Sequence, residues 1–156
     1  ALALAGCSTA SARPSDLTVA AAPPVDQSNA EGATRILDQA MAERLLGNGG
    51  MTLQWISWED RGVASGTIDA DGLWHLSARQ AQAGMGSVTV NGIITEIGAD
   101  YFTFEGEITI ADAPDAGRRC SEDKPWHFGI TQNRAYWRLR EFEWCDGLTD
   151  YIDIYF

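Results

Sequence analysis

Histidine, cysteine and serine are the residues of this chain best suited to catalysis, and their arrangement gives little support for a reaction. His75 and His127 are the only histidines, and both fall on the polar side of alternating stretches. A nucleophilic serine on a sharp turn would need a Gly-x-Ser-x-Gly pattern, which does not occur. Cys120 with His127 is the one nucleophile and base pairing that the sequence offers. We therefore expect no catalytic residues.

Two groups of aspartates could offer oxygen ligands to a calcium ion. Asp69 and Asp71 precede Gly72, as in part of a calcium-binding loop, but the remaining ligands and the closing glutamate are missing. The second group lies near the C-terminus and consists of Asp146, Asp150 and Asp153. Solvated turn carboxylates explain both groups without an ion, so we expect no metal and no cofactor.

The stretch Leu4-Ala5-Gly6-Cys7 resembles the lipobox of bacterial lipoproteins, in which the signal peptide is cut before the cysteine and the cysteine is acylated. The resemblance implies that Cys7 carries lipid, which supplies about 0.8 kcal/mol of membrane affinity per buried methylene. Ser8 after the cysteine fits lipoproteins of the Gram-negative outer membrane. The implied location is the outer membrane, facing the periplasm. The alternative to lipidation is that Cys7 is an unmodified cysteine in a polar tail.

This implied location also bears on the two remaining cysteines, Cys120 and Cys145. Because the periplasm is oxidising, an even pair left over after acylation of Cys7 would form a disulfide. Such a bridge would stabilise the fold by roughly 3 kcal/mol in the chain-entropy model. The alternative is two separate buried thiols.

Composition divides the chain into three parts. Residues 1–7 are expected to be a signal-peptide remnant with the lipobox, and residues 8–27, rich in Ala, Ser, Pro and Thr, a disordered tether. Residues 28–156 are expected to form one domain of a helix and a β-barrel. Ser28 and Glu31 make a capping-box pattern that predicts the start of this helix. Its apolar stripe would consist of Ile36, Leu37, Ala40, Met41 and Leu45, and Gly47 would end it.

From Met51 onward, apolar and polar residues alternate with a period of two, which is typical of strands with one buried face. The alternation recurs in stretches beginning at Met51, Trp74, Phe102, Trp126 and Ile152. Turn signals separate the stretches, and Asn91-Gly92 is either another turn or a kink in one long strand. The gap from Ala111 to Pro125, which holds Cys120, is expected to be the longest loop.

The fold class that follows is mainly β, an antiparallel meander of about eight strands forming a small barrel after one N-terminal amphipathic helix. Closure into a barrel removes exposed edges, and a two-sheet sandwich is the alternative. The shape resembles the lipocalin-like class in architecture only, because the Gly-x-Trp signature near the first strand is absent.

Six tryptophans dominate the apolar residues, and they have two interpretations. They fill the core of a small barrel, or some of them line a cavity for an apolar ligand. The candidates for lining such a cavity are Trp58, Trp74, Trp126 and Trp137. Trp58 and Trp144 break the alternation around them, which favours a position at the rim.

Arginines form a local basic group near the C-terminal end of this acidic chain, whose net charge is −11. Arg134, Arg138 and Arg140 accompany Tyr136 and could bind an anion. The alternative is that they pair with carboxylates on neighbouring strands, for which Glu105, Glu107 and Asp153 are available.

These observations favour a lipid-anchored protein of the bacterial cell envelope. Its expected partners are the membrane, through the lipid anchor, and an apolar small molecule or an envelope protein. The strong negative charge argues against nucleic acid. An envelope hydrolase and a structural protein of outer-membrane assembly are the alternatives.

Overall fold

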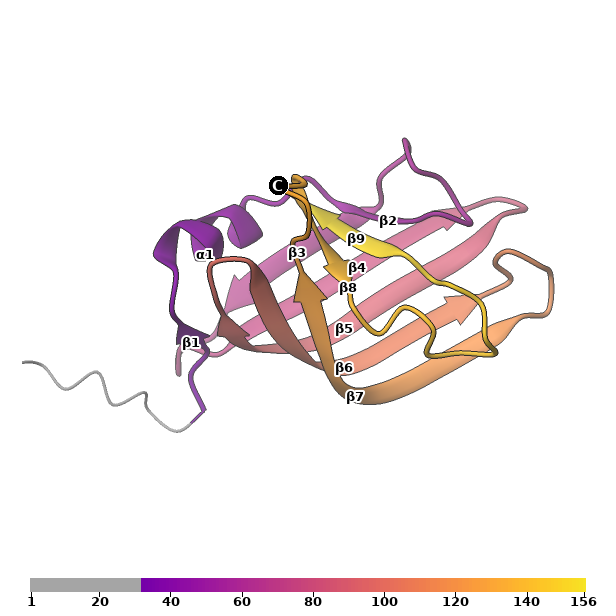
Figure 1. Cartoon of the computed structure of the whole chain (residues 1–156). Coiled ribbons are helices and arrows are strands. Elements are labelled where there is room, and N and C mark those ends of the chain that lie inside the picture. Colours follow the sequence, from indigo (N-terminus) through magenta and orange to yellow (C-terminus); the bar gives the residue numbers. More distant parts are fainter. Residues whose placement is uncertain (1–31) are drawn as a thin grey trace, which may run out of the picture.

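The computed structural model describes residues 32–156, which form a mainly β structure with one short helix (Figure 1). Expectations for residues 1–31, among them lipidated Cys7, the tether and the capping box at Ser28, lie outside the described residues. The elements are β1 (Arg35–Ile36), α1 (Gln39–Leu46), β2 (Met51–Leu53), β3 (Val63–Ile68), β4 (Trp74–Gln82), β5 (Gly86–Ile97), β6 (Tyr101–Ala111), β7 (Arg119–Gly129), β8 (Tyr136–Leu139) and β9 (Ile152–Tyr155).

Eight strands form an antiparallel, nearly closed barrel. Their order is β2-β9-β8-β7-β6-β5-β4-β3, so each strand from β3 to β9 pairs with its neighbours in sequence. The two ends of this order meet at one bridge, where Met51 and Gly62 exchange backbone hydrogen bonds of 3.0 and 2.8 Å. The expected antiparallel barrel is therefore confirmed, and the sandwich alternative is not formed. The ninth strand, β1, pairs in parallel with β5.

The helix differs from the one expected. Residues 35 and 36 belong to β1, and α1 begins after Asp38, whose side chain accepts a hydrogen bond from the backbone N–H of Met41. An aspartate N-cap satisfies an otherwise unpaired N–H group at a helix start. Ile36 and Leu37, assigned to the apolar stripe, are 38% and 55% exposed, whereas Met41 and Leu45 are buried. Within the described residues, no helix has the length and apolar character needed to cross a membrane.

The second correction concerns the expected long loop from Ala111 to Pro125. Only residues 112–118 are a loop, and β7 begins at Arg119, so Cys120 lies in a strand. The alternation predicted β7 only from Trp126, because the polar residues Glu122 and Lys124 occupy the same side of the strand as the buried Cys120. There they pair with each other at 2.6 Å, and the Lys124 ammonium lies 4.3 Å from the centre of the Trp126 ring. The kink interpretation of Asn91-Gly92 is correct, because both residues lie inside β5.

A long segment, residues 140–151, connects β8 to β9 and is fixed by Arg118. Every N–H group of the Arg118 guanidinium donates a hydrogen bond, to both carboxylate oxygens of Asp146, both of Asp150 and the carbonyl of Ala113. Asp150 is fully buried and also accepts a 3.0 Å hydrogen bond from the Trp55 indole. The structure joins Cys120 and Cys145 in a disulfide, the pairing expected from the sequence. Together these contacts hold the segment against β7 and the loop after β2.

The seam between β2 and β4 is closed by a buried glutamine. Gln80 is 3% exposed, its amide oxygen accepts a 2.6 Å hydrogen bond from the Leu53 N–H, and its amide nitrogen donates to the carbonyls of Ser57 and Asp60. Gly62 allows the backbones to meet here, since a Cβ atom at this position would clash with the Arg79 carbonyl oxygen. The Gln80 side chain thus supplies hydrogen bonds at this seam, where β2 and β3 form no ladder.

We expect Gln80→Leu to lower the free energy of unfolding by about 2 kcal/mol, because the Leu53 N–H would remain buried without a partner. Urea denaturation measures the change. Gln82→Leu, two residues further along β4 at an exposed position, is the matched control and should change stability by less than about 0.5 kcal/mol. Equal effects of the two substitutions would contradict the role given to Gln80.

Candidate functional site

The interior of the barrel is lined by tightly packed apolar side chains. Three of the four tryptophans considered for ligand binding belong to this core, since Trp74, Trp126 and Trp137 are 4%, 2% and 0% exposed. Trp137 packs against Phe102 and Phe156, and Trp126 packs edge-on against Trp144. Trp58 is 49% exposed and is therefore the candidate among the four that a ligand in solution reaches directly.

The residues considered for catalysis lie apart from one another. His75 on β4 lies 2.9 Å from Asp69, and the hydrogen bond from this imidazole is the main cause that lowers the pKa of the Asp69 carboxyl. His127 lies on β7, three strands away, or roughly 14 Å at the usual strand spacing. Its ring stacks on Tyr101. Asp146 and Asp150 are bound by Arg118, whose hydrogen bonds lower the pKa of Asp146.

Calcium binding at the two aspartate groups is likewise not favoured. Asp69 accepts hydrogen bonds from the N–H groups of Asp71 and Leu73, which makes it a turn residue. The C-terminal aspartates face two different arginines, Arg118 and Arg138. Cys120, Cys145 and Asp146 come close enough to share an ion, but the two sulfur atoms are already bonded to each other.

Arginine and aromatic side chains instead gather on the outside of β8 and β9. Arg138 lies 4.0 Å from the ring centre of Tyr151 and 5.2 Å from that of Tyr136. Arg61, from the loop after β2, lies 3.8 Å from the ring centre of Tyr155. We call this surface the arginine–aromatic face, and it consists of Trp58, Arg61, Arg134, Tyr136, Arg138, Tyr151 and Tyr155.

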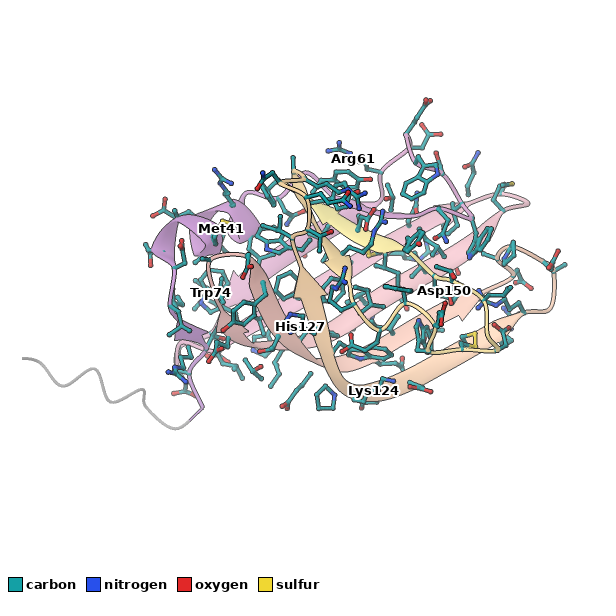
Figure 2. All side chains as sticks on the ribbon, in the orientation of Figure 1. Met41, Arg61, Trp74, Lys124, His127 and Asp150 are labelled. Carbon is teal, nitrogen blue, oxygen red and sulfur yellow. A yellow bond between two sulfur atoms is a disulfide. The ribbon has the colours of Figure 1, made fainter. Side chains whose placement is uncertain are left out.

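The members of the face touch in series. Arg134 stacks on Tyr136, the rings of Tyr136 and Tyr155 lie 5.3 Å apart, and Tyr155 carries Arg61. Trp58 lies beside Arg138, with 5.8 Å between the ring centre and the guanidinium carbon. Guanidinium groups stack favourably on aromatic rings through cation–π attraction. In Figure 2, Arg61 lies beside β2 and β9, on the side of the barrel opposite Lys124.

A buried ion pair anchors the centre of the face. Arg138 and Asp153 are cross-strand neighbours, and the guanidinium donates two 2.7 Å hydrogen bonds to the fully buried Asp153 carboxylate. Burial raises the pKa of the Asp153 carboxyl above its usual range, and the hydrogen bonds from Arg138 partly offset this shift. The same hydrogen bonds raise the pKa of Arg138. This is one of the strand pairings that the sequence suggested for the local basic group.

Two surface clefts lie at the ends of the face. The first, of about 420 Å³, is lined by Arg61 and Arg79 together with Asp60. The second, of about 350 Å³, is lined by Arg44 and Arg134 with Asp100, over an apolar floor that includes Phe156. Each end of the face therefore presents two guanidinium groups and one carboxylate.

Sequence reasoning found part of this surface. The outward register of β8 gave Tyr136 and Arg138, and the exposure of Trp58 was expected. Tyr151 and Tyr155 alternate with the buried isoleucines of β9, and this alternation indicates that both tyrosines point outward. From the sequence alone, neither tyrosine was assigned to a site. Arg61 had no such signal, because it reaches Tyr155 from a loop about ninety residues away in sequence.

Comparison with known proteins identifies relatives of this chain. The model of the PM1083 family matches residues 33–156. A protein of Pasteurella multocida (strain Pm70), named Uncharacterized protein PM1083, is 39% identical over 115 residues, which cover 72% of this chain and 74% of that protein. No solved structure matches the chain at a significant level.

We expect Arg138→Gln to lower the free energy of unfolding by about 3 kcal/mol or more near neutral pH, because Asp153 would remain buried without its partner. A carboxyl whose pKa is higher in the folded than in the unfolded protein favours folding while it is protonated. This contribution is complete below the unfolded value, 3.8, and is lost as the pH rises through the folded value.

The difference in stability between wild type and Arg138→Gln should therefore shrink as the pH is lowered, which urea denaturation over a pH series measures. Arg138→Gln combined with Asp153→Asn removes the unpaired charge and should recover most of the loss at neutral pH. A loss that is the same at every pH, or that the second substitution does not reduce, would show that the ion pair has no such role.

Proposed function

The chain belongs to the PM1083 family, and we propose that it is a lipid-anchored protein of the bacterial cell envelope that binds a ligand or partner through its arginine–aromatic face. The single observation that carries the proposal is the outward position of this face on a barrel whose inward side chains are packed against one another.

The envelope location is supported by the lipobox-like stretch that ends at Cys7 and by the disulfide of Cys120 with Cys145. Disulfides are typical of oxidising compartments such as the periplasm. We propose that acylated Cys7 attaches the domain to the outer membrane, on the periplasmic side, and that residues 8–27 act as the tether.

Binding at the surface is favoured over binding inside the barrel. Inward positions such as Phe102, Phe104 and Ile108 are fully buried by one another, as expected for a packed core. The arginine–aromatic face combines rings, whose flat surfaces contribute strongly to recognition, with guanidinium groups that donate several hydrogen bonds. Tyrosine, tryptophan and arginine are also the residues that carry most of the energy in protein interfaces. A partner in outer-membrane assembly would use the same surface.

The alternative of an envelope hydrolase rests on one cleft of about 350 Å³ that holds His127, Glu105 and Glu141. We place it second because the Glu141 carboxylate already accepts a 3.0 Å hydrogen bond from the His127 backbone N–H. Within residues 32–156, no carboxylate lies within ion-pair distance of the His127 ring. His127 in this cleft is therefore not oriented by a carboxylate of the described residues, as a general base would be.

The proposed lipid anchor predicts the mass of the mature protein and the cell fraction in which it is found. Protein purified from its native host should carry acyl chains on Cys7 and fractionate with the outer membrane, because buried acyl chains supply the membrane affinity. The full-length Cys7→Ser variant should lose both properties, whereas Cys120→Ser should still be acylated. Intact-protein mass spectrometry and membrane fractionation measure these outcomes. An unmodified Cys7 in a protein found in the cytosol would contradict the envelope location.

If the arginine–aromatic face is the binding surface, substitution of its exposed residues should weaken binding to the cell envelope. The full chain with Cys7→Ser, which lacks the lipid, should sediment with isolated cell envelopes, and Trp58→Ala with Arg61→Gln should weaken this binding by about tenfold or more. Both residues are exposed, so the substitutions should leave the fold intact.

Arg119→Gln is the matched control, because Arg119 is an exposed arginine on β7, outside the arginine–aromatic face, and is paired with Asp112. It should bind envelopes as tightly as the parent protein. If the Trp58 and Arg61 substitutions leave envelope binding unchanged, the face is not the binding surface.

A further inference from the structure

Resting on the proposed function, we infer that the ligand of the arginine–aromatic face is an acidic glycan, a chain of sugar rings that carries carboxylate or phosphate groups. The inference uses the free donors of the arginines, the exposed rings and the charge at the two ends of the face.

More than half of the nine arginines in residues 32–156 lack a carboxylate partner, although the chain has 22 acidic residues for 11 basic ones. Five of them have no carboxylate within ion-pair distance among residues 32–156: Arg44, Arg61, Arg79, Arg134 and Arg140. Four of these five stack on aromatic rings instead. A stacked guanidinium keeps the N–H groups along its edge, and these are suited to two parallel hydrogen bonds with an oxyanion.

The arginines within the face keep such donors. Arg61 has one long hydrogen bond, 3.4 Å from its Nη1 atom to the carbonyl of Gly49. In Arg138, the Nε and Nη2 atoms bind Asp153, and Nη1 has no hydrogen-bond partner among the described residues, in a side chain that is 12% exposed. The buried carboxylate thus fixes the orientation of Arg138 while one nitrogen remains available to a ligand.

The aromatic rings indicate a ligand that has flat apolar surfaces as well as charge. Trp58 is 49% exposed, Tyr136 and Tyr151 are partly exposed beside Arg138, and Tyr155 is partly exposed beside Arg61. The C–H groups on one side of a sugar ring pack against the electron-rich surface of an aromatic ring, and the tyrosine hydroxyls can bond to sugar hydroxyls. An acidic peptide would use the guanidinium groups but offers less to the rings.

The charges at the two ends limit how strongly charged the ligand is. Arg61 and Arg79 share their cleft with Asp60, and Arg44 and Arg134 share theirs with Asp100. A densely charged polyanion such as nucleic acid would meet these carboxylates and the strongly negative chain. A glycan with about one negative charge per sugar unit can place its charges on the arginines and its uncharged parts near Asp60 and Asp100.

The test compares probes that separate charge from sugar rings, with the full-length Cys7→Ser protein in a calorimeter. The acidic glycans are oligogalacturonate, which carries carboxylates, and a phosphomannan, which carries phosphates. The methyl ester of oligogalacturonate has the same rings without charge, and poly-L-glutamate has the charge without rings. We expect at least one acidic glycan to bind about tenfold or more tightly than the ester and poly-L-glutamate.

Substitution of the face should remove this preference. Arg61→Gln should weaken binding of the acidic glycan by about tenfold, and Arg119→Gln should leave it unchanged. Binding of poly-L-glutamate as tight as that of the glycans would overturn the glycan assignment. So would a failure of both acidic glycans to bind while envelopes still bind through Trp58 and Arg61, and in that case the proposed binding surface would stand.

Discussion

Hydrogen bonds from side chains to backbone close this barrel where its strand ladders are shortest. Strands β3 to β7 form long ladders, but β8 pairs with β7 at only two residue pairs, and β2 forms a single bridge to Gly62, just before β3. Gln80 bonds across the gap between β2 and β4, and Glu141 accepts the His127 N–H beside the end of the β7–β8 ladder. Arg118 holds the segment between β8 and β9. Without these side chains, buried backbone groups on this side would lack partners.

Closure of the barrel is also the reason why we propose binding on its outer surface. Buried side chains of β2 and of β4 to β9 fill the interior, and Ala64 of β3 packs against them, so the inward tryptophans stabilise the fold. The outward side of the short strands carries the unusual chemistry, because Arg138 and Asp153 form a buried ion pair there and tyrosines cover it. A buried ion pair is weak evidence for stability alone. We interpret this pair as the device that orients Arg138 for binding.

Much of the fold followed from the sequence because burial imposes a period of two on strands. The alternation from Trp74 and from Phe102 located β4 and β6, and turn signals located the connections from β3 to β4 and from β5 to β6. No turn signal was assigned to the hairpin between β4 and β5. The predicted start of the helix was wrong because Ile36 and Leu37 have helical spacing in the sequence but precede the N-cap residue, Asp38. The first half of β7 was missed because the polar residues Glu122 and Lys124, which pair with each other, occupy the side of the strand that Cys120 and Trp126 share. Closure by Gln80 depends on contacts between distant segments, which no local pattern reveals.

The sequence showed parts of the arginine–aromatic face, such as Tyr136 and Arg138 on β8, but not that these parts lie together. The other members come from β9, from the residues that precede β8 and β9 and from the loop after β2, so their proximity depends on the order of strands in the barrel.

The most direct test of the claim that the outside of the barrel is the functional surface is an NMR map of the ¹⁵N-labelled protein during titration with the acidic glycan that it binds. The account predicts that the perturbed signals include the Trp58 indole and the side-chain Nε–H groups of Arg61 and Arg138. Perturbations centred on inward residues such as Phe104 and Trp137 would contradict it.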